Sequence, residues 1–215
     1  MNVKAIITGG IFLLTLSLGE AEYAQHNPMK YFVKDKSSPM VRGAILNQSG
    51  DYPVEGYGPL VNAAIFGYEG VVEILSQDNN VLSHEGGQAL HAAATMGEYH
   101  VARILLEKGV SANSHVERNI TPIFGAAEYG EYRVLCLLLM NGGNVNDKAD
   151  VPYTLLELAI LSGNIRTVKI ILLNGYSPVS EKEASLYQKK YGESLVVDMD
   201  NISTTKGKKV IEYCD

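Results

Sequence analysis

The sequence predicts an all-α protein in which about four helix–turn–helix repeats stack into a solenoid, with a capping helix at each end. Two observations support this prediction: a segment of ten residues recurs along the chain, and an apolar segment follows each copy. We therefore divide the chain into a signal peptide (residues 1–21), an N-terminal lead-in and cap (22–52), the repeats (53–178), and a C-terminal cap helix with a tail (179–215).

The first residues are typical of a signal peptide. Lys4 provides a short positive start, and residues 5–18 form an uncharged, mostly apolar run. Small residues follow in Gly19-Glu20-Ala21, so we expect cleavage after Ala21. An uncleaved anchor is the alternative, but the run is shorter than the roughly 20 residues that span a bilayer. We therefore expect a periplasmic or secreted protein with no stable membrane anchor after cleavage.

The lead-in after the signal peptide is polar and contains one predicted helix. Residues 39–47 are expected to form this helix, with Ser38 as its N-terminal cap. We expect it to pack on the first repeat, since the end repeats of a solenoid need a cover over their outer face.

Each repeat begins with a segment that carries small residues and ends in a glycine. The four copies are residues 58–67, 88–97, 121–130 and 154–163, and their closing glycines are 30, 33 and 33 residues apart. Pro59 and Pro122 stand where a helix begins, where a missing N–H has no cost. Thr121 and Thr154 are expected to cap such helices. The closing glycines permit a tight turn between antiparallel helices.

The second segment of each repeat is bulky and apolar. The four copies are residues 71–75, 101–106, 134–139 and 167–172. The last three are followed by Gly109, Gly142 and Gly175, which suit the left-handed conformation at a helix C-terminus. The first copy ends in residues 77–80 without such a glycine. Since one repeat cannot bury both faces of its helices, neighbouring repeats must stack.

These segments resemble the ankyrin repeat, whose unit runs Thr-Pro-Leu-His, Ala-Ala, Gly, a helix rich in Val and Leu, and then Gly-Ala-Asp-Val-Asn. Thr121-Pro122-Ile123 and Leu90-His91 are the nearest matches, and the resemblance covers about residues 53–178. The first copy departs from the pattern with Gly58 in place of Thr. Only one copy keeps the family's histidine, so the hydrogen-bond network credited to it is incomplete here.

The chain after the fourth repeat is expected to form a helix over residues 181–191. Ser180 followed by Glu183 has the spacing of a capping box, in which the two side chains bond each other's backbone N–H. We interpret this helix as the C-terminal cap of the stack.

The resemblance implies a protein-binding module that uses a concave face, formed by the loop tips before each first helix and the outer ends of those helices. Aromatic and methionine side chains are enriched at protein interfaces, and most charged residues at these positions are acidic. A protein partner with a basic and partly apolar patch is therefore expected. The alternative is that some of the aromatic side chains cover the neighbouring repeat. The candidate partner-binding residues at the loop tips are Glu55, Tyr57, His84, Glu85, Glu117, Arg118, Asp150 and Tyr153. Those on the first helices are Phe66, Met96, Glu128 and Tyr129.

The two cysteines, Cys136 and Cys214, are too few for a disulfide-rich scaffold. We expect two unpaired thiols, with a bridge between them as the alternative. Cys136 occupies the position held by Glu73, Arg103 and Lys169 in the other repeats, which predicts a semi-exposed site.

Composition and motifs disfavour several functions. The net charge of −6 disfavours nucleic acid, because such binding depends on Lys and Arg at phosphates. The sequence has no zinc-protease histidine spacing, Gly-Xaa-Ser-Xaa-Gly motif or phosphate loop. We expect no catalytic residue, metal or cofactor. The predicted role is a non-catalytic periplasmic adaptor, or an inhibitor or immunity protein that occludes an enzyme or toxin. The alternatives are a secreted effector that binds host proteins and an enzyme with an unrecognised site.

Overall fold

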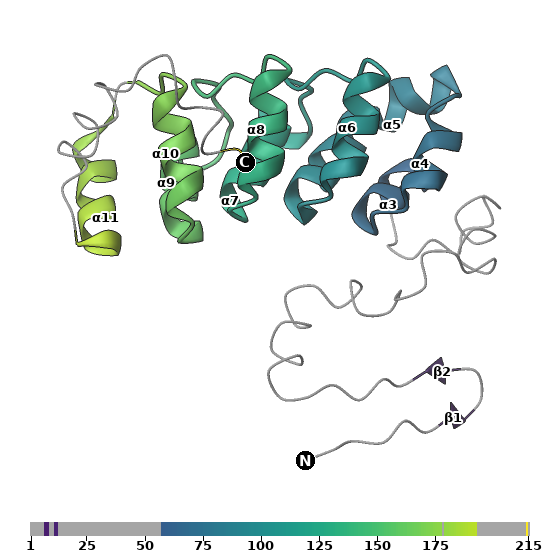
Figure 1. The fold of residues 1–215 in the computed structure, drawn as a ribbon, viewed down its shortest axis with the longest axis horizontal. Coiled ribbons are helices and arrows are strands. Elements are labelled where there is room, and N and C mark those ends of the chain that lie inside the picture. The colour runs from purple at the N-terminus through teal and green to yellow at the C-terminus, as the bar shows by residue number, and fades with distance from the viewer. Residues whose placement is uncertain (1–6, 9–10, 13–56, 178, 193–213, 215) are drawn as a thin grey trace.

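The structure of the protein is a computed structural model that describes residues 7–8, 11–12, 57–177, 179–192 and 214 (Figure 1). Near the start of the chain, β1 (Ile7–Thr8) pairs antiparallel with β2 (Ile11–Phe12). The predicted helix over residues 39–47 and Glu55 lie outside the described residues.

Helical hairpins stand side by side along the repeat region (Figure 1). First helices pack on first helices and second helices on second helices, and α11 packs on α9. This arrangement confirms the predicted stack of four repeats with a C-terminal helix within the described part of the chain. The hairpins are α3 (Pro59–Ile65) with α4 (Glu69–Leu75), α5 (Asn79–Met96) with α6 (Tyr99–Glu107), α7 (Pro122–Glu128) with α8 (Tyr132–Met140), and α9 (Leu155–Ser162) with α10 (Ile165–Leu173), followed by α11 (Glu181–Tyr191).

The core runs through the whole stack. The alanine pairs of the first helices, such as Ala93-Ala94 and Ala126-Ala127, are fully buried, so neighbouring first helices approach closely. Larger side chains from both helices of each hairpin fill the rest of the core, and Leu90, Leu105 and Leu135 are examples that are also fully buried. Burying one leucine stabilises a protein by roughly 1.5–3 kcal/mol, so this apolar layer is a major source of stability.

Glycines shape the turns as predicted. Gly67, Gly97, Gly130 and Gly163 have φ values of 65°, 69°, 70° and 82° at the turn inside each hairpin. A Cβ at three of them would meet the next repeat, since the carboxylate of Glu98 lies against Gly67, that of Glu131 against Gly97, and Asn164 against Gly130. Each contacting residue directly follows the turn glycine of its own hairpin, so the same contact recurs between neighbouring repeats.

The predicted helix starts are confirmed with one exception. Pro59 and Pro122 lie in the first turns of α3 and α7. Thr154 and Ser180 form complete capping boxes with their respective third helical residues. Thr121 occupies the N-cap of α7, but its side chain makes no capping hydrogen bond there.

The second repeat differs from the prediction of a loop tip at His84 and Glu85. Both residues lie in α5, which runs without a break from Asn79 to Met96. The first repeat is three residues shorter than the others and has no C-terminal glycine after α4, so little chain is left for a loop. Asp78 caps the longer helix by accepting a hydrogen bond from the Asn80 N–H at 2.8 Å.

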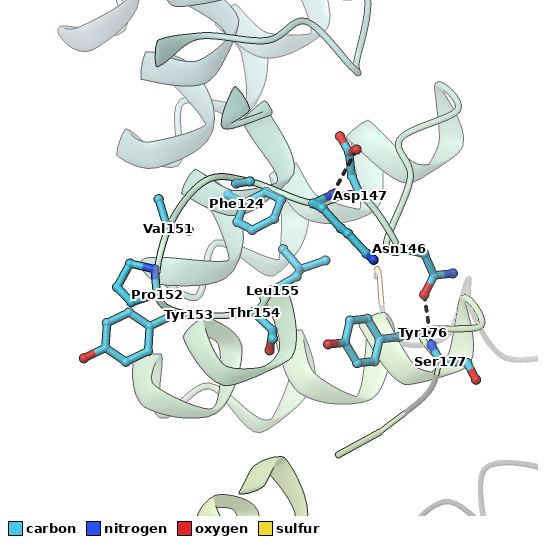
Figure 2. Close-up of a pocket in the computed structure, with 12 residues that line it drawn as sticks. Phe124, Asn146, Asp147, Val151, Pro152, Tyr153, Thr154, Leu155, Tyr176 and Ser177 are labelled. Atoms are coloured by element: carbon cyan, nitrogen blue, oxygen red, sulfur yellow. Dashed lines mark hydrogen bonds between the residues drawn. The ribbon is translucent and has the colours of Figure 1, made fainter. Parts of the chain in front are cut away.

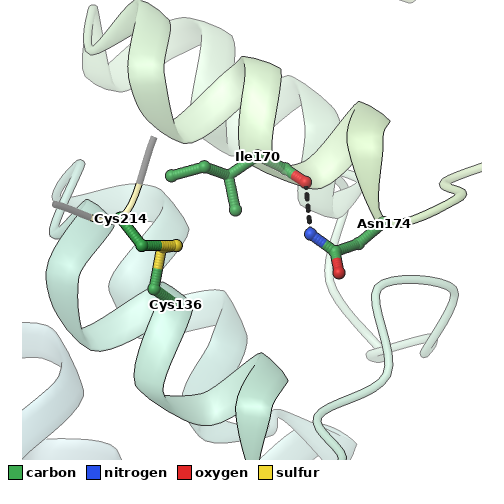
Figure 3. The surroundings of a disulfide bond; sticks show 4 residues. All are labelled: Cys136, Ile170, Asn174 and Cys214. Atoms are coloured by element: carbon green, nitrogen blue, oxygen red, sulfur yellow. Dashed lines mark hydrogen bonds between the residues drawn. A yellow bond between two sulfur atoms is a disulfide. The ribbon is translucent and has the colours of Figure 1, made fainter. Parts of the chain in front are cut away.

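A disulfide bond joins Cys136 and Cys214, which corrects the expectation of unpaired thiols (Figure 3). Cys136 is only 3% exposed, not semi-exposed, whereas Glu73 and Arg103 at the equivalent positions are exposed. The bond fixes Cys214 against α8, with Ile170 of α10 nearby. The two cysteines are 78 residues apart, and repeat spacing does not reveal that the chain returns to α8.

Candidate protein-binding surface

The loops that precede α7 and α9 are linked by asparagine side chains. Asn113 donates to the Gly142 carbonyl at 2.9 Å and accepts from the Asn144 N–H at 3.0 Å. One repeat later, Asn146 bonds Gly175 and Ser177 in the same way, at 3.1 and 2.9 Å. These pairs hold successive loops at a constant spacing.

The tip of the loop before α7 contains a short 3₁₀ helix, η1 (Glu117–Asn119), and Arg118 and Asn119 there have positive φ values. Asp150 of the next loop closes on this tip. Its N–H donates to the Arg118 carbonyl at 2.8 Å, and its carboxylate accepts from the Asn119 amide at 2.7 Å. Glu117, Arg118 and Asp150 are exposed, so the charged tip that the sequence predicted is accessible.

The outer ends of α7 and α9 form an exposed patch, which we call the Tyr129 patch and define as Glu128, Tyr129 and Leu161. Tyr129 is 54% exposed and Leu161 is 46% exposed. Glu128 and Leu161 occupy equivalent positions on helices that pack against each other. Met96 occupies the position of Tyr129 one repeat earlier and is half-buried. The patch therefore offers an aromatic ring and an aliphatic group beside a carboxylate.

Two further tyrosines from the predicted set lie at the loop ends. Tyr57 and Tyr153 are 44% and 48% exposed. The ammonium group of Lys182 lies 5.9 Å from the centre of the Tyr153 ring, so a cation already covers one face of that ring. Tyr57 is at the opposite end of the stack.

Three predicted contact residues change their roles. Phe66 is only 6% exposed and its ring lies 5.7 Å from that of Tyr68, so it belongs to the core. Glu85 caps α3, since its carboxylate accepts from the Leu60 N–H at 2.8 Å and the Val61 N–H at 3.3 Å. His84 is exposed on α5, where its ring bonds the carbonyl one turn earlier.

A cluster of buried carboxylates lies near the starts of α9 and α11. The sequence predicted the capping box of Ser180 with Glu183, but it did not predict that these carboxylates are buried together. Glu183 is 1% exposed and accepts hydrogen bonds from Thr154, Tyr176 and Ser180. Burial alone would raise the pKa of Glu183, but these hydrogen bonds outweigh burial and hold the pKa below its ordinary value. Burial and the bond to Glu183 raise the pKa of Tyr176 to about 12. Glu157, also buried, pairs with Lys182 at 2.6 Å.

His91, the one histidine that matches the family position, lies half-buried between repeats. Burial lowers its pKa, and a hydrogen bond with the Thr121 backbone opposes that shift. This contact with the next repeat favours a structural role. The described residues contain no group of three or more His, Cys, Asp or Glu side chains placed to hold a metal ion. None of the helices in the described part has the length and apolar character to cross a membrane.

Comparison with known proteins identifies the repeat. The family described as ankyrin repeats, in three copies, matches residues 17–115 and 60–149. None of the curated proteins matches the chain significantly. Since the matched stretches together span residues 17–149, more than half of the 215-residue chain, the protein belongs to the ankyrin-repeat family, whose repeats are generally non-catalytic protein–protein interaction modules.

Proposed function

We propose that the protein works in the periplasm as a non-catalytic binding module that occludes a partner enzyme or toxin, or holds it as an adaptor. The observation that carries this proposal is the Tyr129 patch. An exposed aromatic ring, with an exposed aliphatic side chain on the neighbouring helix, is the kind of anchor that dominates the binding energy of protein interfaces. Its place at the outer ends of the first helices agrees with the face that the family resemblance predicts.

Charge around the patch supports a partner with a basic and partly apolar surface. Glu117, Glu128 and Asp150 are exposed acidic residues on the loop tips and helix ends, and Arg118 adds one positive charge. The chain as a whole carries a net charge of −6. Complementary charge would speed the encounter with a basic partner, and the apolar contacts would slow its dissociation.

The disulfide supports export of the protein. Structural disulfides persist in oxidising compartments such as the bacterial periplasm and are rare in the cytosol. Cys136 and Cys214 form such a bond, and the chain begins with the features of a cleavable signal peptide. The two observations are independent, and both favour a periplasmic or secreted site of action.

Affinity purification from the native periplasm tests this proposal. The bait is the chain after residue 21, compared with a double variant, Glu128→Lys with Tyr129→Ala. A matched control, Glu107→Lys with Met140→Ala, makes the same kinds of change on second helices, where Glu107 is exposed and Met140 is 78% exposed. We expect the patch variant to lose its partner by tenfold or more, as is typical for a hot-spot residue, while the control retains it.

Retention of the partner by the patch variant at full strength would show that the Tyr129 patch is not the binding surface. Turnover of a substrate by the purified protein, lost in a point variant, would overturn the non-catalytic role. Accumulation of the protein in the cytosol with an intact N-terminus would contradict export.

A further inference from the structure

A pocket of about 350 Å³ lies at the C-terminal end of the loop series, under the loop that precedes α9 (Figure 2). Its floor consists of Phe124 and Leu155, which are both buried. Residues 146–153 arch over one side, and Tyr176 and Ser177 close the other (Figure 2). This volume falls at the lower end of the range for binding sites in proteins.

The repeat register shows what fills the equivalent space one repeat earlier. Each residue that lines the pocket lies 33 positions after a residue of the preceding repeat, so that Phe124 corresponds to His91 and Lys148 to His115. There, the next loop contacts His115 and the loop tip at residues 118–119. The carboxylate of Asp147 lies 3.8 Å from His115, and Asp150 bonds the tip at Arg118 and Asn119.

Within the described part of the chain, the loop that would fill this pocket is missing. Positions 33 residues after Asp147 and Asp150 are Ser180 and Glu183, which form the capping box of α11 instead of a loop. The chain needs twelve residues from Gly142 to Thr154 but only five from Gly175 to Ser180. The fifth unit therefore keeps its first helix and lacks the loop before it.

The groups at the rim of the pocket suit a peptide segment that carries an acidic side chain. Lys148 is exposed and has no ion-pair partner among the described residues. Val151 holds the repeat position of Arg118, whose carbonyl accepts the Asp150 N–H, but the backbone differs there, since Arg118 and Asn119 have positive φ values and Val151 does not. The nearby carboxylates already have partners, since Asp147 faces His115 and Glu183 accepts from Thr154 and Tyr176.

We propose that this pocket binds an extended acidic segment of a protein partner, which takes the place of the missing loop. A carboxylate of the segment pairs with Lys148, as Asp147 pairs with His115 one repeat earlier. The site continues the loop-to-loop interface of the preceding repeats, and it is separate from the Tyr129 patch. The proposal therefore goes beyond the proposed function and needs no basic group on the partner.

Titration with a synthetic peptide tests the pocket directly. The probe copies residues 144–151 of this chain, the segment that fills the equivalent space one repeat earlier. We expect saturable amide shifts at Lys148, Val151, Tyr153 and Ser177 in nuclear magnetic resonance spectra of the full chain. A dissociation constant of about 1 mM or tighter is reasonable for a peptide of this size.

Three comparisons define the result. The same peptide with asparagine in place of both aspartates is expected to bind about fivefold more weakly. The original peptide is expected to bind a Lys148→Glu variant more weakly by about the same factor. A matched Lys108→Glu variant, which changes an exposed lysine on the second-helix side, should bind the peptide normally. Circular dichroism checks that both variants remain folded.

The proposal is overturned if about 5 mM peptide produces no saturable shifts at the pocket, a concentration well above the expected dissociation constant. It is also overturned if Lys148→Glu leaves the affinity unchanged. Self-association of the chain that Lys148→Glu abolishes would show that a second copy, and not a partner, occupies the pocket. The Glu128→Lys, Tyr129→Ala variant is expected to bind the peptide normally, since it changes the Tyr129 patch and not the pocket. This result would separate the test of the pocket from the test of the proposed function.

Discussion

The carboxylate of Glu183 is the most constrained polar group at the C-terminal end of the stack. One oxygen accepts from the hydroxyls of Thr154 and Tyr176, and the other accepts from the amide and hydroxyl of Ser180. It thereby joins the start of α9 to the start of α11 and to the chain between them. The buried charge of Glu183 is tolerated because the hydroxyls of Thr154, Tyr176 and Ser180 and the Ser180 amide all donate to its carboxylate.

Glu183→Gln is expected to lower the free energy of unfolding by about 2 kcal/mol at pH 7, because the amide nitrogen faces donors that need an acceptor. Since the folded-state pKa of Glu183 lies below its ordinary value of 4.5, its contribution is present above that pH and is lost as the pH falls through the folded-state pKa. Urea denaturation measures the difference from the unchanged protein, which should be constant between about pH 6 and 8 and should shrink below about 4.5.

The control for this prediction is Glu181→Gln, which changes an exposed carboxylate in the same first turn of α11. We expect less than about 0.5 kcal/mol of change there, as for most surface substitutions. A difference for Glu183→Gln that did not vary with pH would mean that the loss comes from packing and not from the charge.

At the scale of the element, α3 has an unusual cap. Its N-cap is Gly58, and the carboxylate of Glu85 from α5 supplies the acceptor that a threonine side chain would otherwise provide. A Cβ at position 58 would collide with that carboxylate. Gly58 and the early start of α5 are therefore parts of one arrangement, because only a continuous α5 brings Glu85 to this place.

A double-mutant cycle tests this arrangement. Glu85→Ala is expected to lower the free energy of unfolding by about 1 kcal/mol, the usual value of a helix cap. In a Gly58→Thr background the same substitution should have almost no effect, because the new hydroxyl caps the helix and the carboxylate is already displaced. Urea denaturation of the four proteins gives the coupling, and additive effects would show that the two sites are independent.

The sequence predicted what depends on local chemistry and repeat register. The turn glycines, the capping box at Ser180 and the bounds of α11 follow from short-range rules, and the structure agrees. Glu85 was assigned to a loop because the pattern of the other repeats was applied to a shorter one. Its position in the repeat predicted that Phe66 lies on the surface. In the structure the ring of Phe66 packs against that of Tyr68 and is buried in the core.

Contacts between distant segments could not be decided from repeat spacing, which left the Cys136–Cys214 bridge as an alternative only. The Cys136–Cys214 bond depends on the path of the chain after α11, and the pocket depends on where a loop is absent. In the candidate site, Tyr129 and Tyr153 are exposed whereas Phe66 is buried. This difference depends on how neighbouring side chains pack in the folded protein. The sequence could therefore name candidate side chains but could not tell which of them are exposed.

At the scale of the whole molecule, the disulfide ties the end of the chain to the third repeat. Solenoid stability is a sum of repeat and interface contributions, so a stack tends to open from its ends. A cross-link over 78 residues reduces the freedom of the unfolded chain. It also fixes the C-terminal end against α8, so opening from that end should be harder.

Reduction of the disulfide is expected to lower the free energy of unfolding by about 2–4 kcal/mol. A Cys214→Ser variant should begin at the lower value and should not respond to the reductant. Hydrogen exchange should rise on reduction more in α8, α10 and α11 than in α3 and α4, because the cross-link holds the C-terminal end. Equal acceleration throughout the stack would mean that it unfolds as one unit.

The contact between each turn glycine and the following repeat also governs how this protein can change its length. Gly67 meets Glu98 and Gly97 meets Glu131, so two successive junctions use the same pair of residue types. If a second copy of residues 98–130 were inserted after Gly130, the copied Glu98 would face Gly97, Glu131 would face Gly130, and the copied Gly130 would face Asn164. Duplication of this one unit would thus create no mismatched junction, so the middle of this stack can be lengthened by one repeat without a new kind of contact.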